Sequence, residues 1–198
     1  MSCDIPLSCR CGDTTGALLD AAPRTGDHIV CHCIDCQDLA RLTGHADMLD
    51  DHGGSALFQG RCARIRIDAG LGTLRCVHLT DEPTLRWYAG CCETPLFNTY
   101  KNGKVPYLAT QVAALDPGSR GALGKPRGHL HLRDAQGDTA HLTAMTEAQL
   151  MRRFALRALR DLFSGARRRS PLFDSETLEP IVPPRRLSDA EKSRLGRD

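Results

Sequence analysis

The chain has 198 residues, the size of a single globular domain, and its hydrophobic residues (41%) together with 18 glycines supply enough apolar material for a buried core, which excludes wholesale disorder. No apolar run approaches the roughly 18 residues of a membrane-spanning helix, and the first residues lack the pattern of a secretory signal, so we expect a cytoplasmic protein with no membrane partner. The formal net charge is +2, but residues 150–198 hold 12 Lys and Arg against 7 Asp and Glu, so the positive charge is concentrated near the C-terminal end.

Short segments rich in β-branched and aromatic residues, separated by turn signals, predict a mainly β body over residues 1–145. A short helix is expected from Cys36 through Leu42, ending near Gly44. The alternation over residues 64–68 has the period of a strand with one face in water, so its arginines are expected on a solvated face. The expected strands lie near residues 15–21, 28–32, 63–68, 74–79, 84–89 and 95–100.

Residues 101–128 show little periodicity and are expected to form a loop-rich connection, followed by a strand at 128–133. That strand would place His129 and His131 on one face, a spacing that metal sites also use. Because no third ligand lies nearby in the sequence, we interpret both histidines as ordinary polar strand residues.

The clearest helix is predicted from Thr146 to Ser164, so residues 146–165 form an amphipathic C-terminal helix packed on the β body. Thr146 and Gln149 fit a capping box, and Gly165 suits the end of the helix. The arginines lie mostly off the apolar stripe and are expected to be solvated, so no nucleic-acid partner is expected. Residues 166–198 are expected to form a basic, Pro-rich, partly ordered tail. The stripe comprises Leu150, Met151, Phe154, Ala155, Ala158, Leu159, Leu162 and Phe163.

Ten cysteines carry the strongest functional signal, because clustered thiols in a reducing compartment more often indicate metal or redox chemistry than disulfides. Zinc suits such clusters, since a tetrahedral ion holds its sulfurs roughly 3.8 Å apart, a separation that one tight turn can supply. Five thiols within residues 9–36 would also repel one another as thiolates without a cation. We therefore predict that the cysteines of three sequence groups bind metal: Cys9 and Cys11; Cys31, Cys33 and Cys36; and Cys91 and Cys92.

The central motif, Cys31-His32-Cys33-Ile34-Asp35-Cys36, offers three thiolates within six residues. Three protein ligands and one open position are typical of catalytic zinc, and an ion held by three thiolates is better suited to holding an incoming thiol than to activating water. The alternative is that His32, Cys3 or a side chain from elsewhere closes the site and leaves it structural.

In this order, the motifs Cys9-Arg10-Cys11-Gly12, Cys31 to Cys36, and Arg86 to Phe97 resemble the glutathione-dependent formaldehyde-activating enzymes and their centromere protein V-like relatives. The likeness covers about residues 5–100 and implies a β-tent fold with two zinc ions per chain. It implies a structural ion at Cys9, Cys11 and Cys92, and a second ion at Cys31, Cys33 and Cys36. At the second ion the family adds a thiol to formaldehyde, or reverses that addition, as a carbon-sulfur lyase.

The third motif departs from the family pattern, because Ala89 stands where the family has a cysteine, and Cys91 is adjacent to Cys92. Neighbouring strand residues point to opposite faces, so both could bind one ion only if the backbone turns sharply, which Gly90 permits. The structural site would otherwise be completed by Cys3 or by solvent. Glu93 replaces the family's glycine and Gln37 its usual arginine, so the use of glutathione itself is left open.

Two classes of function remain from the sequence. The first is a zinc-dependent carbon-sulfur lyase-like enzyme for a small thiol–aldehyde adduct, with Cys31, Cys33 and Cys36 as its catalytic residues and Asp35 and His32 as acid–base candidates. The second is a non-catalytic zinc module with a basic C-terminal interaction segment. A thiol-redox sensor that uses Cys33 and Cys36, or the vicinal pair, is a third option. The oligomeric state is left open.

Overall fold

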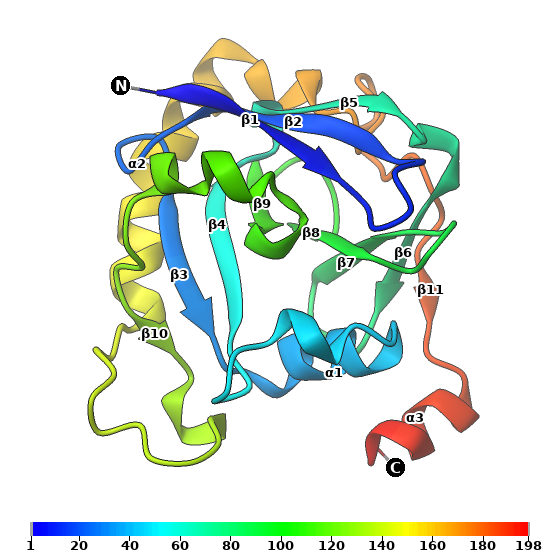
Figure 1. The fold of residues 1–198 in the computed structure, drawn as a ribbon. Coiled ribbons are helices and arrows are strands. Elements are labelled where there is room, and N and C mark those ends of the chain that lie inside the picture. Colours follow the sequence, from blue (N-terminus) through cyan, green and yellow to red (C-terminus); the bar gives the residue numbers. More distant parts are fainter. Residues whose placement is uncertain (1, 198) are drawn as a thin grey trace.

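A computed structural model describes residues 2–197 and has a mainly β body with a C-terminal helix, as the sequence predicts (Figure 1). The strands are β1 (Cys3–Ser8), β2 (Thr15–Ala21), β3 (Asp27–Cys31), β4 (Ser55–Arg61), β5 (Ile65–Ala69), β6 (Leu74–His78), β7 (Thr84–Ala89), β8 (Pro95–Tyr100), β9 (Tyr107–Gln111), β10 (His129–Leu130) and β11 (Arg185–Arg186). One sheet has the order β1–β2–β5, and the other has the order β10–β3–β4–β9–β8–β7–β6–β11. Strand pairs are antiparallel except at the two edges of the large sheet, where β10–β3 and β11–β6 are parallel.

The main core lies between the two sheets, where the small sheet covers one face of the large one. Trp87 and Phe97 are fully buried there, and the Trp87 indole packs edge-to-face on Phe173 with ring centroids 6.2 Å apart. Trp87 Nε1 donates to the Thr99 hydroxyl at 2.8 Å, so the buried indole is satisfied. Successive strand residues point to opposite faces, so Arg86 and Asn98 lie on the other face of the large sheet.

That second face is covered by two helices, α1 (Ile34–Leu42) and α2 (Glu147–Ser164). Leu39 and Leu42 of α1 pack near Val77 and Tyr88, whereas Leu150 of α2 packs over β3, β4 and β9. α1 begins at Ile34 rather than at the predicted Cys36, so Cys36 lies in its first turn. Among residues 2–197, no helix combines the length and the apolar character that a bilayer crossing requires.

The predictions of three strands are confirmed with identical bounds at β2, β7 and β8, but the loop-rich connection at 101–128 is wrong in part. Residues 107–111 form β9, a central strand between β4 and β8. β4 also escaped prediction. β4 (SALFQGR) contains no β-branched residue, and β9 follows a stretch of Gly, Lys and Pro, so neither showed the composition on which the other strand predictions rest.

The strand predicted at 128–133 is reduced to the two residues of β10. His131 has φ 56°, a left-handed conformation uncommon for residues other than glycine, so it does not share a strand face with His129. The structure contradicts the prediction that the two histidines lie side by side.

α2 has the predicted capping box, in which Gln149 N donates to the Thr146 hydroxyl at 3.3 Å and Thr146 N donates to the Gln149 side chain at 3.0 Å. Gly165 ends the helix with φ 67°. The prediction that the whole apolar stripe of α2 packs on the β body is only partly right. Leu150, Phe154 and Ala158 are buried, whereas the remaining members of the apolar stripe are exposed: Met151, Ala155, Leu159, Leu162 and Phe163.

The last residues that the structure describes run along the edge of the large sheet and reach α1. β11 pairs with β6, and a short helix, α3 (Asp189–Leu195), follows. Arg197 then donates to Asp35 at 2.6 Å and also to Asp38, both of which belong to α1. The C-terminal segment therefore ties the helix that carries Cys36 to the rest of the molecule.

Candidate metal centres

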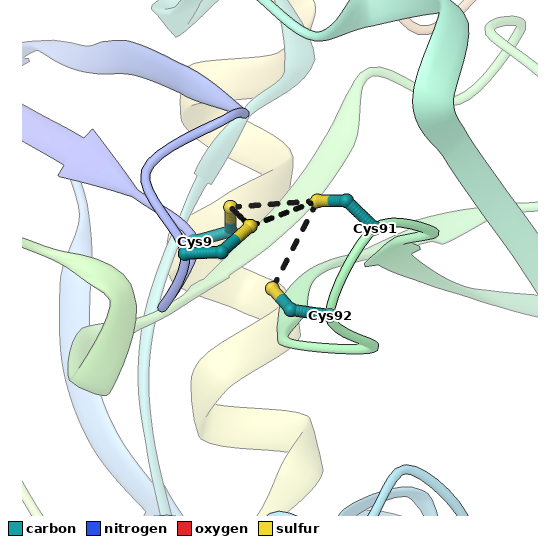
Figure 2. Close-up of side chains that lie close together, drawn as sticks. Cys9, Cys91 and Cys92 are labelled. Carbon is teal, nitrogen blue, oxygen red and sulfur yellow. Dashed lines mark hydrogen bonds between the residues drawn. The ribbon is translucent and has the colours of Figure 1, made fainter.

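Four cysteines from two distant turns converge in one group, which we name the first cluster: Cys9, Cys11, Cys91 and Cys92 (Figure 2). Their ligand atoms all lie within 4.8 Å of one another. The sulfur separations are 3.5 Å for Cys9–Cys11, 3.7 Å for Cys9–Cys91, 3.2 Å for Cys11–Cys91 and 3.9 Å for Cys91–Cys92. Separations near 3.8 Å suit four thiolates around a tetrahedral zinc ion, so this group fits a closed structural site.

The turn between β1 and β2 presents the first two cysteines of this cluster. Cys9 N donates to Thr14 O at 2.9 Å, and Gly12 N donates to Cys9 O at 3.1 Å, so the chain folds tightly after Cys9. Thr14 N also donates to Cys9 Sγ at 3.3 Å. Arg10 N reaches across to the Thr94 hydroxyl at 3.0 Å, which holds the two turns against each other.

The turn between β7 and β8 presents both members of the vicinal pair, the arrangement that the sequence left open. Ala89 N donates to Thr94 O at 3.0 Å, and Glu93, where the resembling family has glycine, takes φ 58°. This turn brings the Cys91 and Cys92 sulfurs to the same side. Cys3 lies at the start of β1, outside the group, so the completion by Cys3 that the sequence left open does not occur.

The pKa of Cys92 shows how this turn favours a thiolate. Burial alone would raise that pKa, but hydrogen bonds from the Thr94 hydroxyl and from backbone N–H groups of Cys11 and Thr94 lower it to about 6. The Cys92 sulfur and the Thr94 hydroxyl oxygen are 3.1 Å apart. A thiolate is the form in which cysteine binds zinc.

The central cluster consists of Cys31, Cys33 and Cys36, which lie at the junction of β3 and α1. Cys31 ends β3, Cys33 is the residue before α1, and Cys36 N donates to Cys33 O at 3.0 Å in the first turn. The Cys31 and Cys33 sulfurs are 3.4 Å apart. Hydrogen bonds from the Cys31 and Cys33 thiols, aided by the charge of Arg86, hold the pKa of the buried Cys36 well below its ordinary value.

Arg86 is a buried cation beside this cluster that sequence reasoning did not single out as functional. Its Nη1 donates to Cys36 Sγ at 3.6 Å, and its Nη2 lies 3.4 Å from Asp35. A guanidinium can share a negative charge with a thiolate ligand. The sequence did offer one signal: within the predicted strand, Arg86 stands in a run of apolar and aromatic residues, Leu85 to Ala89, all of which are buried in the structure.

His131 is the second residue that the structure adds, because its ligand nitrogen lies within 4.8 Å of the ligand sulfurs of Cys31 and Cys33. His32, which the sequence offered as a possible ligand, instead uses both ring nitrogens elsewhere. Its Nε2 is 3.0 Å from His129 Nδ1, and its Nδ1 is 3.2 Å from His52 O. No sequence signal linked His131 to the cysteines, since 95 residues or more separate it from each member of the central cluster.

Asp35, which the sequence offered with His32 as an acid–base candidate, is also engaged with other side chains. Asp35 accepts from Arg197 at 2.6 Å and lies against Arg86, so its carboxylate is occupied by two cations.

All three thiols of the central cluster line a cavity of about 880 Å³ between the large sheet and α2. Its wall includes apolar side chains from β3 and β4, polar side chains from β7 and β8, and Tyr107 of β9. His131 and Glu147 lie on its wall as well. A mostly apolar cavity of this size with a few converging polar groups is typical of small-molecule sites.

Comparisons with known proteins bear on the family. No curated protein matches this sequence. A crystal structure of a Rhodobacter sphaeroides protein, a structural genomics target, is similar over 61% of this chain and 96% of that chain, with 17% sequence identity and a TM-score of 0.42. A protein-family model described as a family of unknown function, DUF6151, matches residues 1–180. The chain therefore belongs to the DUF6151 family.

Proposed function

We propose that this protein is a zinc-dependent carbon-sulfur lyase-like enzyme that acts on a small thiol–aldehyde adduct of the S-hydroxymethyl type. The observation that carries the proposal is the position of Cys31, Cys33 and Cys36, whose thiols line a cavity large enough for a small molecule. The order of the cysteine motifs supports it through the resemblance to formaldehyde-activating enzymes, which also suggests a β-tent fold. We further propose a cytoplasmic location, as the sequence suggests.

The residues of the central cluster would hold one zinc ion, and the first cluster would hold a second, structural one. Zinc bound to the central thiols would lower the pKa of a substrate thiol and hold its sulfur. Arg86 would donate to Cys36 and offset the negative charge of three thiolates. The apolar wall around Leu57 and Leu150 would exclude water from the adduct.

The reaction balances without an oxidant or reductant. The hydroxyl group of the adduct loses its proton, its oxygen forms the carbonyl double bond, and the carbon–sulfur bond breaks. The sulfur keeps the electron pair of that bond and takes up one proton, so the products are a thiol and an aldehyde. The reverse sequence forms the adduct.

The direct test uses ¹³C-formaldehyde and 2-mercaptoethanol and measures by NMR how fast free and adduct-bound formaldehyde exchange. We expect the zinc-loaded protein to accelerate this exchange and Cys33→Ser to abolish the acceleration while losing one zinc ion per chain. Cys3→Ser is the matched control, because Cys3 lies outside both clusters, and it should keep full exchange and both ions. Unchanged exchange and zinc content in Cys33→Ser would disprove the proposal.

A non-catalytic zinc module is the second candidate, and one observation favours it. The ligand atoms of His131, Cys31 and Cys33 lie within 4.8 Å of one another, so His131 would close the central site as a fourth protein ligand if Cys36 supplies the third sulfur. If the protein binds two zinc ions but accelerates exchange with neither 2-mercaptoethanol nor other small thiols, this second candidate replaces the first.

A further inference from the structure

The backbone carries His131 to the central cluster by a specific route. β10 pairs in parallel with β3, in a register that sets Leu130 opposite Cys31, and His32 N donates to Leu130 O at 3.0 Å. His131 is the next residue and takes a left-handed φ of 56°. Backbone strain at a residue other than glycine is concentrated at functional sites, where the surrounding structure holds it in place.

A carboxylate fixes the ring of His131. His131 Nε2 and Glu147 Oε1 are 2.9 Å apart, and Glu147 is the first residue of α2. When Nε2 carries the hydrogen that Glu147 accepts, Nδ1 keeps its lone pair. Metal-binding histidines usually donate their second N–H to a carboxylate or carbonyl in this manner, which fixes the tautomer.

We propose that His131 is an exchangeable fourth ligand of the central site, positioned by Glu147, and that a substrate thiol binds by displacing it. The first half of this inference concerns the metal site alone, whereas the exchange rests on the function proposed above. The ligand atoms of Cys31, Cys33 and His131 lie within 4.8 Å of one another, and Cys36 would add a third sulfur to give a common donor set for tetrahedral zinc.

The surroundings of the four ligands explain why His131 is the one to exchange. Cys31 ends β3, Cys33 precedes α1, and Cys36 lies in the first turn of α1, which Arg197 anchors, whereas His131 follows a two-residue edge strand. Glu147 is 68% exposed, so water can hydrate its carboxylate when the His131 ring moves away from the metal. His131 is also a wall residue of the cavity, so its departure leaves the open position facing the substrate.

Cobalt(II) in place of zinc provides a readout that does not depend on turnover. We expect His131→Ala to change the cobalt d–d absorption of the loaded protein. Cobalt bound at the first cluster absorbs equally in both proteins, so its contribution cancels in the difference spectrum. Adding 2-mercaptoethanol should increase the sulfur-to-cobalt charge-transfer absorption of the wild-type protein. If His131 occupies the fourth coordination position about nine-tenths of the time, the thiol can bind to only about a tenth of the wild-type protein. His131→Ala should then bind 2-mercaptoethanol about tenfold more tightly than the wild-type protein.

Glu147→Gln tests the positioning role. It removes the charge that orients the ring but leaves the Thr146–Gln149 capping box in place. We expect about a tenfold loss of cobalt affinity at the central site and unchanged far-ultraviolet circular dichroism. Glu176→Gln, an exposed carboxylate remote from both clusters, is the control and should leave cobalt affinity unchanged.

The outcomes separate this inference from the proposed function. Identical cobalt spectra for the wild-type protein and His131→Ala would overturn the inference even if turnover persists. A changed spectrum, with thiol binding only to His131→Ala, would establish the ligand and overturn the exchange. A changed spectrum with no thiol binding to either protein would overturn both the exchange and the lyase proposal, and it would support the zinc-module alternative.

Discussion

Arg86 illustrates how one residue balances the charge of the central cluster. A divalent ion with three thiolates carries one net negative charge, and the guanidinium of Arg86 lies 3.6 Å from the Cys36 sulfur to offset it. The arginine is itself buried, and burial alone would favour its neutral form, but the negative charges around Cys36, Cys33 and Asp35 raise its pKa above the ordinary value. The cation and the thiolates therefore stabilise each other's charged forms.

Replacing Arg86 by Met tests this dependence. We expect the free energy of unfolding of the metal-loaded protein to fall by about 3 kcal/mol, because a buried thiolate loses its compensating charge. Arg75→Met removes an exposed arginine from the neighbouring strand β6 and should change the same quantity by no more than about 0.5 kcal/mol. Chemical denaturation of the three proteins measures the difference, and equal stabilities would contradict the role of Arg86.

The vicinal pair gives a second prediction for single residues. Cys92→Ser should lower the zinc content by one ion per chain, because the four sulfurs of the first cluster lie within one coordination sphere. Cys76→Ser is a control in the large sheet, since Cys76 is buried away from both clusters and should not change the zinc count. Elemental analysis measures the number of zinc ions per chain in both variants. Two ions retained in Cys92→Ser would exclude Cys92 as a ligand.

At the scale of elements, α2 has an unusual division of its faces. Arg153 and Arg157 lie on its inner side and bind the fully buried Asp27 of β3, which also accepts from Arg127 at 2.8 Å. Asp161 of the same helix is buried against Arg61 of β4. On the outer side, Leu156 and Phe163 are 73% and 88% exposed. The predicted solvated arginine face is therefore wrong for Arg153 and Arg157, because a buried carboxylate on the sheet pairs with both of them.

Asp27→Asn tests how far these ion pairs hold α2 on the sheet. Three arginines would lose their common anion, and we expect unfolding to become easier by about 3–5 kcal/mol. Asp68→Asn is the matched control, because its pair with Arg66 is exposed to solvent and its loss should leave the free energy of unfolding nearly unchanged. Thermal and urea unfolding compare the two variants, and a loss in Asp27→Asn no greater than that in Asp68→Asn would refute the anchoring role.

For the whole molecule, the first cluster connects the two sheets. Cys9 and Cys11 lie in the β1–β2 turn of the small sheet, whereas Cys91 and Cys92 lie in the β7–β8 turn of the large sheet. An ion bound by all four therefore acts as a crosslink across the core. It would add to the apolar core between the sheets, in which Trp87 and Phe97 are fully buried.

Metal removal should therefore destabilise the whole fold and not only one site. At a free zinc concentration about 1,000-fold above the dissociation constant, each bound ion adds about 4 kcal/mol to stability. We expect a chelator to lower the melting temperature of the wild-type protein and zinc to restore it. Calorimetry with and without the chelator makes the measurement, and an unchanged melting temperature after confirmed metal loss would contradict a structural role.

The sequence by itself determined the features that depend on neighbouring residues. The composition of β2, β7 and β8 with their flanking turn signals, the Thr146–Gln149 capping box and the stop at Gly165 all reflect interactions within a few positions. The short spacings within the three cysteine groups are local in the same sense, so thiol clusters could be predicted before their partners were known.

The tertiary structure alone decided what depends on distant segments meeting. Local composition did not reveal β4 and β9, and only their pairing in the middle of the large sheet shows them to be strands. His131 reaches the central cluster only through parallel pairing of β10 with β3 and a left-handed backbone turn, and Arg86 reaches it only because β7 lies beneath α1. Sequence patterns record which face of an element is apolar, whereas the identity of the group opposite that face is set by how the elements pack.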